Sequence, residues 1–164
     1  LFFFLELNEQ STVKDFLDAY RKKEVATPHA YDFFRACYLS TLAEKQREAL
    51  KILDTEDFVD FEFGEEAFTL ALKLSYHLYE DESLELSLDR ILKYLKIKSA
   101  STEEKEEWKR SRRFIGKLIK LRRQQKLSAP SLFRKRLDKL THEIHALHEF
   151  PLKHWVMDCL KNLK

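Results

Sequence analysis

Apolar side chains recur three or four positions apart along most of the chain, which is the spacing of one face of an α-helix. The first such stripe lies between Val13 and Tyr20, and it predicts an amphipathic helix that ends near Lys23. The last stripe runs from Trp155 to Leu163. The pattern predicts an all-α protein of about seven helices, built as consecutive antiparallel hairpins in a bundle or a short helical-repeat, solenoid-like arrangement.

Residues typical of helix starts separate these stripes. Four glutamates, at 103, 104, 106 and 107, follow Ser101 and Thr102, which suits both capping and the helix dipole, so a helix is predicted from there to about Lys126. We expect further helices to begin at Pro28 after an N-cap Thr27, at Ser40 or Thr41, at Glu65, at Ser83 after the acidic break 80–82, and at Pro130.

The segment after Pro130 has apolar residues at alternating spacings of four and three, which is typical of a coiled-coil seam. The segment is too short for a free-standing coiled coil, so its seam is expected to pack within the domain. The seam residues are Phe133, Leu137, Leu140, Ile144 and Leu147.

Two predicted hairpins between Pro28 and Lys98 resemble each other at a spacing that drifts from 37 to 39 residues. Such a spacing resembles that of tetratricopeptide or HEAT repeats. The small-residue packing positions of tetratricopeptide repeats are absent, however, and only two units are present, so a bundle of similar neighbouring hairpins is the favoured alternative. The matching residues are Ala30, Tyr31 and Phe33 with Ala67, Phe68 and Leu70, and Ile52 and Leu53 with Ile91 and Leu92.

Acidic residues alternate with Phe58, Phe61 and Phe63 between Asp54 and Gly64. The segment could be a short extended stretch, but its many acids favour a loop. Its aromatic side chains could dock into the groove of a partner. Aromatic residues in such loops more often contact the core, so we expect a loop that its phenylalanines anchor.

The composition is that of a folded helical protein. Hydrophobic residues make up 44% of the chain and include 13 Phe, which argues against disorder, and only 2 Gly and 3 Pro leave little material for tight hairpins. At 164 residues, one all-helical domain spanning residues 1–164 is the default expectation.

Cys37 and Cys159 lie among apolar residues at helical spacing, which predicts buried free thiols in a reducing compartment rather than a disulfide. The apolar run Leu1 to Leu5 lacks the flanks of a secretory signal, and no stretch is long enough to span a bilayer. We therefore expect an intracellular protein, cytoplasmic or nuclear, with an organelle as a further possibility. The missing initiator Met suggests a fragment of a larger protein.

The formal net charge of +2 conceals a strong charge asymmetry. Residues 1–107 carry 14 Lys and Arg against 24 Asp and Glu, whereas residues 108–164 carry 16 against 4. The formal charge is therefore −10 in the acidic region 1–107 and +12 in the basic region 108–164. This asymmetry predicts that the basic region meets an anionic surface, either in another molecule or within this chain.

The basic residues of the segment 108–126 share one helix face. On a helical wheel they lie opposite an apolar arc that includes Trp108, Phe114 and Leu118, and only Arg122 and Lys126 fall out of place. The next helix extends the positive field as far as Lys139. The residues predicted to bind an anion, a nucleic acid or another partner are Lys109, Arg110, Arg112, Arg113, Lys117, Lys120, Arg123, Arg134, Lys135 and Arg136.

Three anionic partners suit such a face. Nucleic-acid phosphates bind Lys and Arg without sequence selectivity. An acidic protein surface is equally suitable, and the chain's own segments 54–66 and 80–85 could supply one. An anionic membrane is the least favoured, because the apolar arc is expected to serve the core. A charge run is often only a solvated helix face, but the one-sided arrangement here favours a binding surface.

No motif for catalysis or cofactor binding is recognisable. His142, His145 and His148 have a spacing that suggests a metal site, but neither the zinc-peptidase nor the di-iron pattern accompanies them. We therefore expect no metal, no cofactor, no small-molecule substrate and no enzymatic activity.

The sequence thus predicts a non-catalytic interaction or scaffold domain of a larger assembly, which binds protein subunits and presents a basic helix face to an anionic surface. The alternative is a nucleic-acid-binding module that contacts DNA or RNA backbones without sequence specificity. No base-stacking motif or zinc-finger spacing supports specific recognition. A helical enzyme is a distant third.

Overall fold

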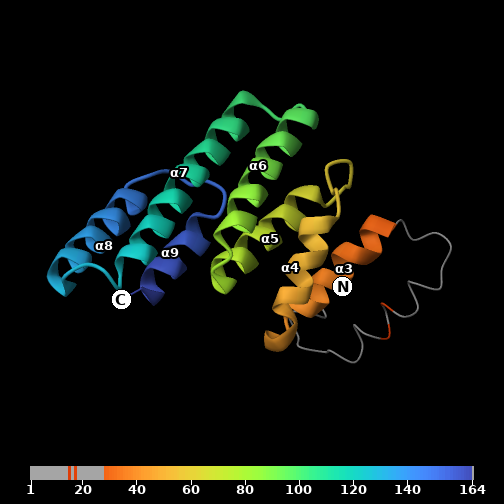
Figure 1. The fold of residues 1–164 in the computed structure, drawn as a ribbon. Helices are drawn as coiled ribbons and strands as arrows, with labels where there is room; N and C mark the ends of the chain where they lie inside the picture. The colour runs from red at the N-terminus through yellow and green to blue at the C-terminus, as the bar shows by residue number, and fades with distance from the viewer. Residues whose placement is uncertain (1–14, 16, 18–27, 164) are drawn as a thin grey trace. The chain divides into compact units, whose positions relative to one another are not determined.

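The computed structural model describes residues 15, 17 and 28–163, and this portion of the chain is all-helical, with no strand (Figure 1). The predicted all-α fold is therefore confirmed. The helix predicted for 11–23, the N-cap Thr27 and the apolar run 1–5 lie outside the described residues, apart from positions 15 and 17. The described helices are α3 (Pro28–Ser40), α4 (Gln46–Thr55), α5 (Gly64–Leu78), α6 (Asp81–Ile97), α7 (Thr102–Gln124), α8 (Pro130–His145) and α9 (Lys153–Asn162), with a short 3₁₀ turn η1 (Ala43–Lys45) before α4.

The chain divides into two compact units, residues 1–99 and 100–164, here called unit 1 and unit 2. Unit 1 carries 13 Lys and Arg against 20 Asp and Glu, whereas unit 2 carries 17 against 8. The structural boundary therefore lies close to the charge boundary at Glu107, which falls inside α7. That both units form one domain stays a prediction.

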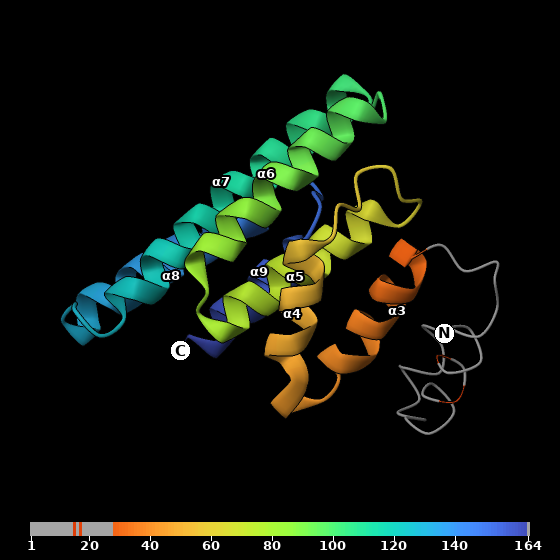
Figure 2. The same cartoon turned by 45° about the vertical axis from the view of Figure 1, so that its right-hand side comes forward.

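Unit 1 contains α3 to α6, and each helix packs against the next one along the chain. Figure 2 shows α3 beside α4 and α5 beside α6. This is the predicted succession of hairpins, and it is compatible with either a bundle or a helical repeat. The core takes one apolar side from each helix, and its fully buried side chains include Phe33, Leu53, Phe68, Leu72 and Ile91.

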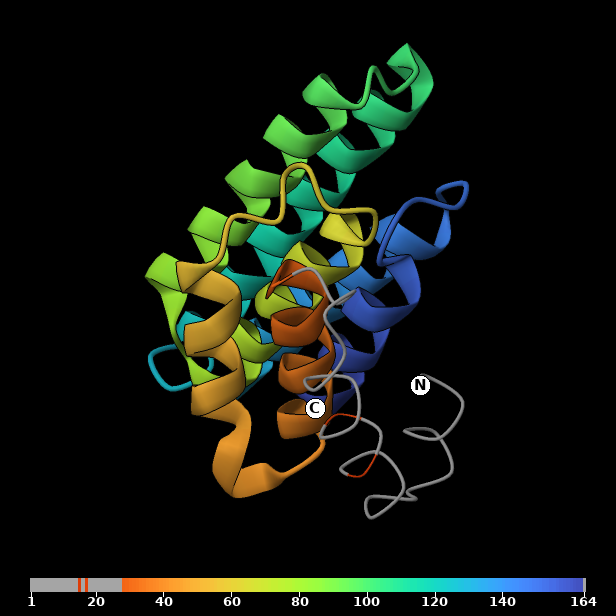
Figure 3. The same ribbon diagram turned by 90° about the vertical axis from the view of Figure 1, so that its right-hand side faces the viewer.

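The acidic and aromatic segment between α4 and α5 is a loop that its phenylalanines anchor. Figure 3 shows it running from the end of α4 to the start of α5. Phe58 is fully buried, and its ring centroid lies 6.4 Å from those of both Phe33 and Phe68. The ring of Phe63 stacks on Phe33 at 6.0 Å, and that of Phe61 lies 5.7 Å from it. The predicted anchoring is confirmed, so these rings serve the core of unit 1.

The predicted start at Ser40 or Thr41 is wrong. Both hydroxyls donate hydrogen bonds back into the last turn of α3, from Ser40 to the carbonyl oxygen of Cys37 and from Thr41 to that of Tyr38, each at 2.7 Å. Helix α4 begins only at Gln46, after η1. The two residues thus stabilise the end of one helix rather than the start of the next, since a Ser or Thr hydroxyl can either donate to a carbonyl oxygen of the preceding turn or accept from a backbone N–H of the following helix.

Ser83, a predicted N-cap, is also placed differently. Helix α6 begins at Asp81, so the acidic residues form its first turn, where the helix dipole favours negative charge. Ser83 lies inside the helix and donates a 2.7 Å hydrogen bond to the carboxylate of Asp54. Arg90 donates to the carbonyl oxygens of Leu53 and Asp54, at 3.0 and 2.6 Å. Side chains of α6 therefore donate hydrogen bonds to the acceptor groups at the C-terminal end of α4.

Unit 2 contains α7, α8 and α9, and each of these helices contacts the other two. Figure 1 shows α8 and α9 lying along α7. Ser101 caps α7 as predicted, because its hydroxyl accepts a 3.1 Å hydrogen bond from the backbone N–H of Glu104. The buried hydroxyl of Ser111 donates to the carbonyl oxygen of Pro151 at 2.6 Å, which ties α7 to the segment before α9.

The seam of α8 is confirmed except at its end. Phe133, Leu137, Leu140 and Ile144 are all buried. Leu147 is half-buried and lies beyond the helix, which ends at His145. The seam therefore stops one turn earlier than predicted, since the chain turns there toward α9.

Both cysteines are buried and neither forms a disulfide, as predicted. Burial raises the pKa of the Cys37 thiol to about 12. Within the described residues, none of the helices has the length and apolar character that crossing a membrane requires.

Candidate anion-binding groove

Helix α7 separates its apolar and basic residues much as the helical wheel predicts. The apolar arc is buried, with Trp108 3% exposed and Ile115 and Leu118 fully buried. Of the two predicted exceptions, Arg122 is confirmed, because it is only 7% exposed, and Lys126 lies beyond the end of α7. Helix α7 ends at Gln124, two residues before the predicted end.

The ten predicted site residues differ in their exposure and in the pocket that they line. Arg110, Arg112 and Lys117 are half-buried, and the other members are exposed. Three of the ten line a groove between α7 and α8, namely Lys117 and Lys120 from α7 and Arg136 from α8. Arg134 lines a different pocket. The members that line neither are Lys109, Arg110, Arg112, Arg113, Arg123 and Lys135.

A groove of about 480 Å³ lies between α7 and α8. Its floor includes Leu121 and Leu140, which are 5% and 7% exposed. Four cationic side chains line it against a single carboxylate, so its formal charge is +3. The polar lining residues are Lys117, Lys120 and Gln124 from α7, and Arg136, Lys139 and Glu143 from α8. The groove therefore brings together cations from two helices over an apolar floor.

Glu143 is the one acidic residue of the groove. Its carboxylate accepts hydrogen bonds from the Lys117 ammonium group at 2.6 and 2.8 Å, and the Arg113 guanidinium lies 3.5 Å away. The hydrogen bond from Lys117 is the main reason why the pKa of Glu143 lies below its ordinary value. Lys117 also lies 5.1 Å from the centroid of the Phe114 ring, which adds a cation–π contact. One groove cation is thus already neutralised.

The other groove cations form no hydrogen bond or ion pair with a carboxylate in the described residues of unit 2. Arg136 donates instead to the neutral side chains of Gln124 and Ser128, at 2.7 and 3.4 Å. Lys120 and Lys139 are exposed and form no ion pair within 4 Å there, although the charge of Lys139 helps to lower the pKa of Glu143. By contrast, Lys109 lies outside the groove and pairs with Glu106 at 2.7 Å. Positive charge without a carboxylate in direct contact therefore gathers at Lys120, Arg136 and Lys139.

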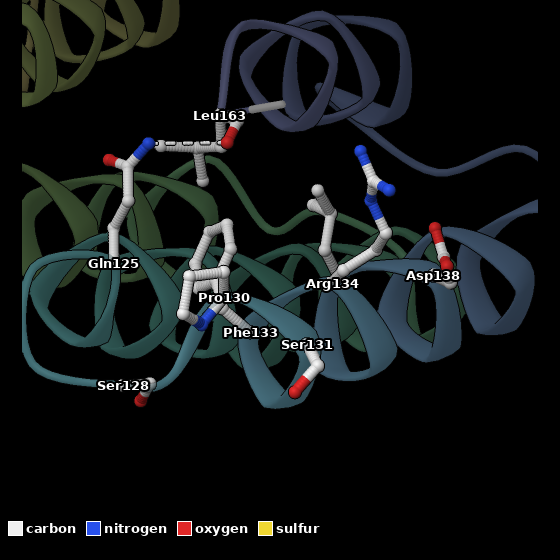
Figure 4. A pocket seen from close by; sticks show the side chains of 9 residues that line it. Gln125, Ser128, Pro130, Ser131, Phe133, Arg134, Asp138 and Leu163 are labelled. Carbon is white, nitrogen blue, oxygen red and sulfur yellow. Dashed lines mark hydrogen bonds between the residues drawn. The ribbon is translucent and has the colours of Figure 1, made fainter.

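Arg134 lines a second pocket, of about 700 Å³, near the end of the chain. Figure 4 shows the rings of Pro130 and Phe133 between Gln125 and Arg134. The side-chain amide of Gln125 donates a 3.2 Å hydrogen bond to the carbonyl oxygen of Leu163. Asp138 lies at the same pocket, so its lining carries one positive and one negative side chain. It lacks the excess of positive charge that distinguishes the groove.

The histidines at 142, 145, 148 and 154 are not buried. Among the residues that the structure describes, no group of three or more His, Cys, Asp or Glu side chains is placed to hold a metal ion.

The sequence pattern identifies three of the four groove cations as site residues but misses the roles of Gln124 and Glu143. In the sequence, Glu143 stands out only as a neighbour of the histidines. Its pairing with Lys117 spans 26 positions, so no spacing rule within one helix could reveal it. Lys139 is recognisable only as an extension of the positive field, although it lines the groove.

Comparison with known proteins adds no assignment, because no family model, no curated protein and no solved structure matches the chain.

Proposed function

We propose that the chain is a non-catalytic helical interaction domain and that the groove between α7 and α8 binds an anionic surface of a protein partner. The observation that carries this proposal is the excess of four cations over one carboxylate around a single groove with an apolar floor. Clusters of one sign of charge in a concave site concentrate the electrostatic field and attract a partner of opposite charge.

Nonspecific binding to nucleic-acid phosphates is the second candidate. It is supported by the same cations, since Lys and Arg side chains bind phosphate and carboxylate groups alike. The two buried thiols, neither of which forms a disulfide, support a reducing, intracellular setting as part of this proposal.

The test is a binding titration of the full chain with two fluorescent probes, poly-aspartate and a single-stranded oligonucleotide, across a salt series. Lys120→Ala/Lys139→Ala should weaken binding at least tenfold, because it removes two of the four cations that line the groove. For the oligonucleotide, the slope of log affinity against log salt should become shallower by about 1.4, at roughly 0.7 per lost contact.

The matched control is Lys126→Ala/Lys135→Ala, which removes the same charge from exposed positions that do not line the groove. This variant should stay within threefold of the unsubstituted chain for both probes. Equal losses in the two variants would mean that a diffuse positive field, rather than the groove, attracts the anion. If neither probe binds the unsubstituted chain at low salt, the proposed function is wrong.

A further inference from the structure

Two large apolar side chains of unit 2 are exposed, one in the turn between α7 and α8 and one at the start of α8. Leu127, in the turn between α7 and α8, is 85% exposed, and Leu132, in the first turns of α8, is 44% exposed. Within the described residues of unit 2 these are the only large hydrophobic side chains with such exposure. A single exposed leucine is ordinary, but these two lie only five positions apart in the chain, and we treat them as one apolar patch.

The patch adjoins the groove through Arg136. Leu132 precedes Arg136 by one helical turn, so both lie on the same side of α8. Arg136 also reaches Gln124 at 2.7 Å and Ser128 at 3.4 Å, which holds its guanidinium against the turn that carries Leu127. Arg136 therefore belongs both to the lining of the groove and to the immediate neighbourhood of the two leucines in the chain.

We infer that the occupant of this surface is a short acidic protein segment with apolar side chains at one end. Its carboxylates would meet Lys120, Arg136 and Lys139, and its apolar end would cover Leu127 and Leu132. This inference rests on the proposed function and narrows it to one class of partner. A nucleic-acid backbone matches the charges but leaves both leucines in water, whereas a segment of mixed acidic and apolar character matches both regions of the surface.

The experiment compares three fluorescent probes on the full chain at one moderate salt concentration. One probe is a short aspartate-rich peptide with two leucines at one terminus, tested in both sequence directions. The second is the same peptide with serines in place of the leucines, and the third is a single-stranded oligonucleotide of equal charge. In its better direction, the leucine peptide should bind about tenfold more tightly than the serine peptide.

The leucine contribution is assigned with Leu127→Ser/Leu132→Ser. This variant should lose the tenfold preference and keep its affinity for the serine peptide. Leu86→Ser/Ile97→Ser is the matched control, because these exposed apolar residues lie in unit 1 at 42% and 48% exposure, and it should keep the preference. Far-UV circular dichroism verifies that each variant retains its helical content.

The possible failures are distinguishable. Equal binding of the leucine and serine peptides would overturn the inference while leaving the groove as an anion site. Tighter binding of the oligonucleotide than of the leucine peptide would overturn it in favour of nucleic acid. If none of the probes binds, the proposed function fails together with the inference.

Discussion

Replacing Glu143 with Gln should make the groove a stronger anion site. The carboxylate of Glu143 forms a 2.6 Å ion pair with Lys117 and lies 3.5 Å from Arg113. It therefore competes with any anionic ligand for these two cations. Because the pKa of Glu143 lies below its ordinary value, this competing charge is fully present at neutral pH. The amide of Gln keeps nearly the same shape but carries no charge.

The size of the effect follows from the charges that line the groove. They change from four cations and one carboxylate to four cations alone, so the formal charge rises from +3 to +4. At roughly 0.7 per contact, the salt slope for a single-stranded oligonucleotide should steepen from about −2 to about −3. Removing one opposing charge about 4 Å from a bound anion is worth about 1 kcal/mol in water, or roughly a fivefold gain in affinity at low salt.

Fluorescence anisotropy across a salt series measures both quantities. Glu106→Gln is the matched control, since Glu106 forms a comparable 2.7 Å pair with Lys109 on the same helix. It precedes Lys117 by eleven residues, or about 16 Å along α7, which exceeds the screening length of about 8 Å at physiological salt. Unchanged affinity and slope in Glu143→Gln, or equal changes in both variants, would refute the claim that Glu143 competes within the groove.

Three further predictions concern stability and reactivity. Gly64→Ala should lower the unfolding free energy by about 1–3 kcal/mol, because its new Cβ would lie 2.4 Å from the carbonyl oxygen of Phe58. Gly116→Ala, whose Cβ would meet nothing within 4 Å, should leave the unfolding free energy unchanged or raise it by up to about 1 kcal/mol. Urea denaturation followed by circular dichroism measures both changes, and an unchanged stability of Gly64→Ala would contradict the packing at the start of α5. Phe58→Ala should cost about 3–5 kcal/mol in the same assay because its ring is fully buried; a loss under about 1 kcal/mol would show that the loop is not anchored. Cys37 in the folded protein should resist a thiol reagent at pH 8 and react only when the chain is unfolded. The unfolding free energy should fall as the pH rises from 9.0 toward 12, because only the thiol of the unfolded chain ionises in that range. Rapid labelling of both cysteines in the folded protein would contradict their burial.

Helix content and the sides of the helices were predictable because they depend on local periodicity. Ser101 followed by glutamates identified the start of α7, and the apolar spacing after Pro130 identified the buried side of α8. The loop phenylalanines were expected in the core, and Phe58 is fully buried there. The errors arose where a short polar side chain had two possible partners, as at Ser40 and Ser83, because a hydroxyl can cap the next helix or bond elsewhere.

Composition and residue spacing are properties of the chain alone, and they were enough to establish its helical character, its charge asymmetry and the basic side of α7. Which of those cations act together depends on how the helices pack. Packing of α8 against α7 places Arg136 and Lys139 across a groove from Lys120, and it sets Glu143 on Lys117. Helix pairing joins residues far apart in the sequence, and no helical wheel contains that information.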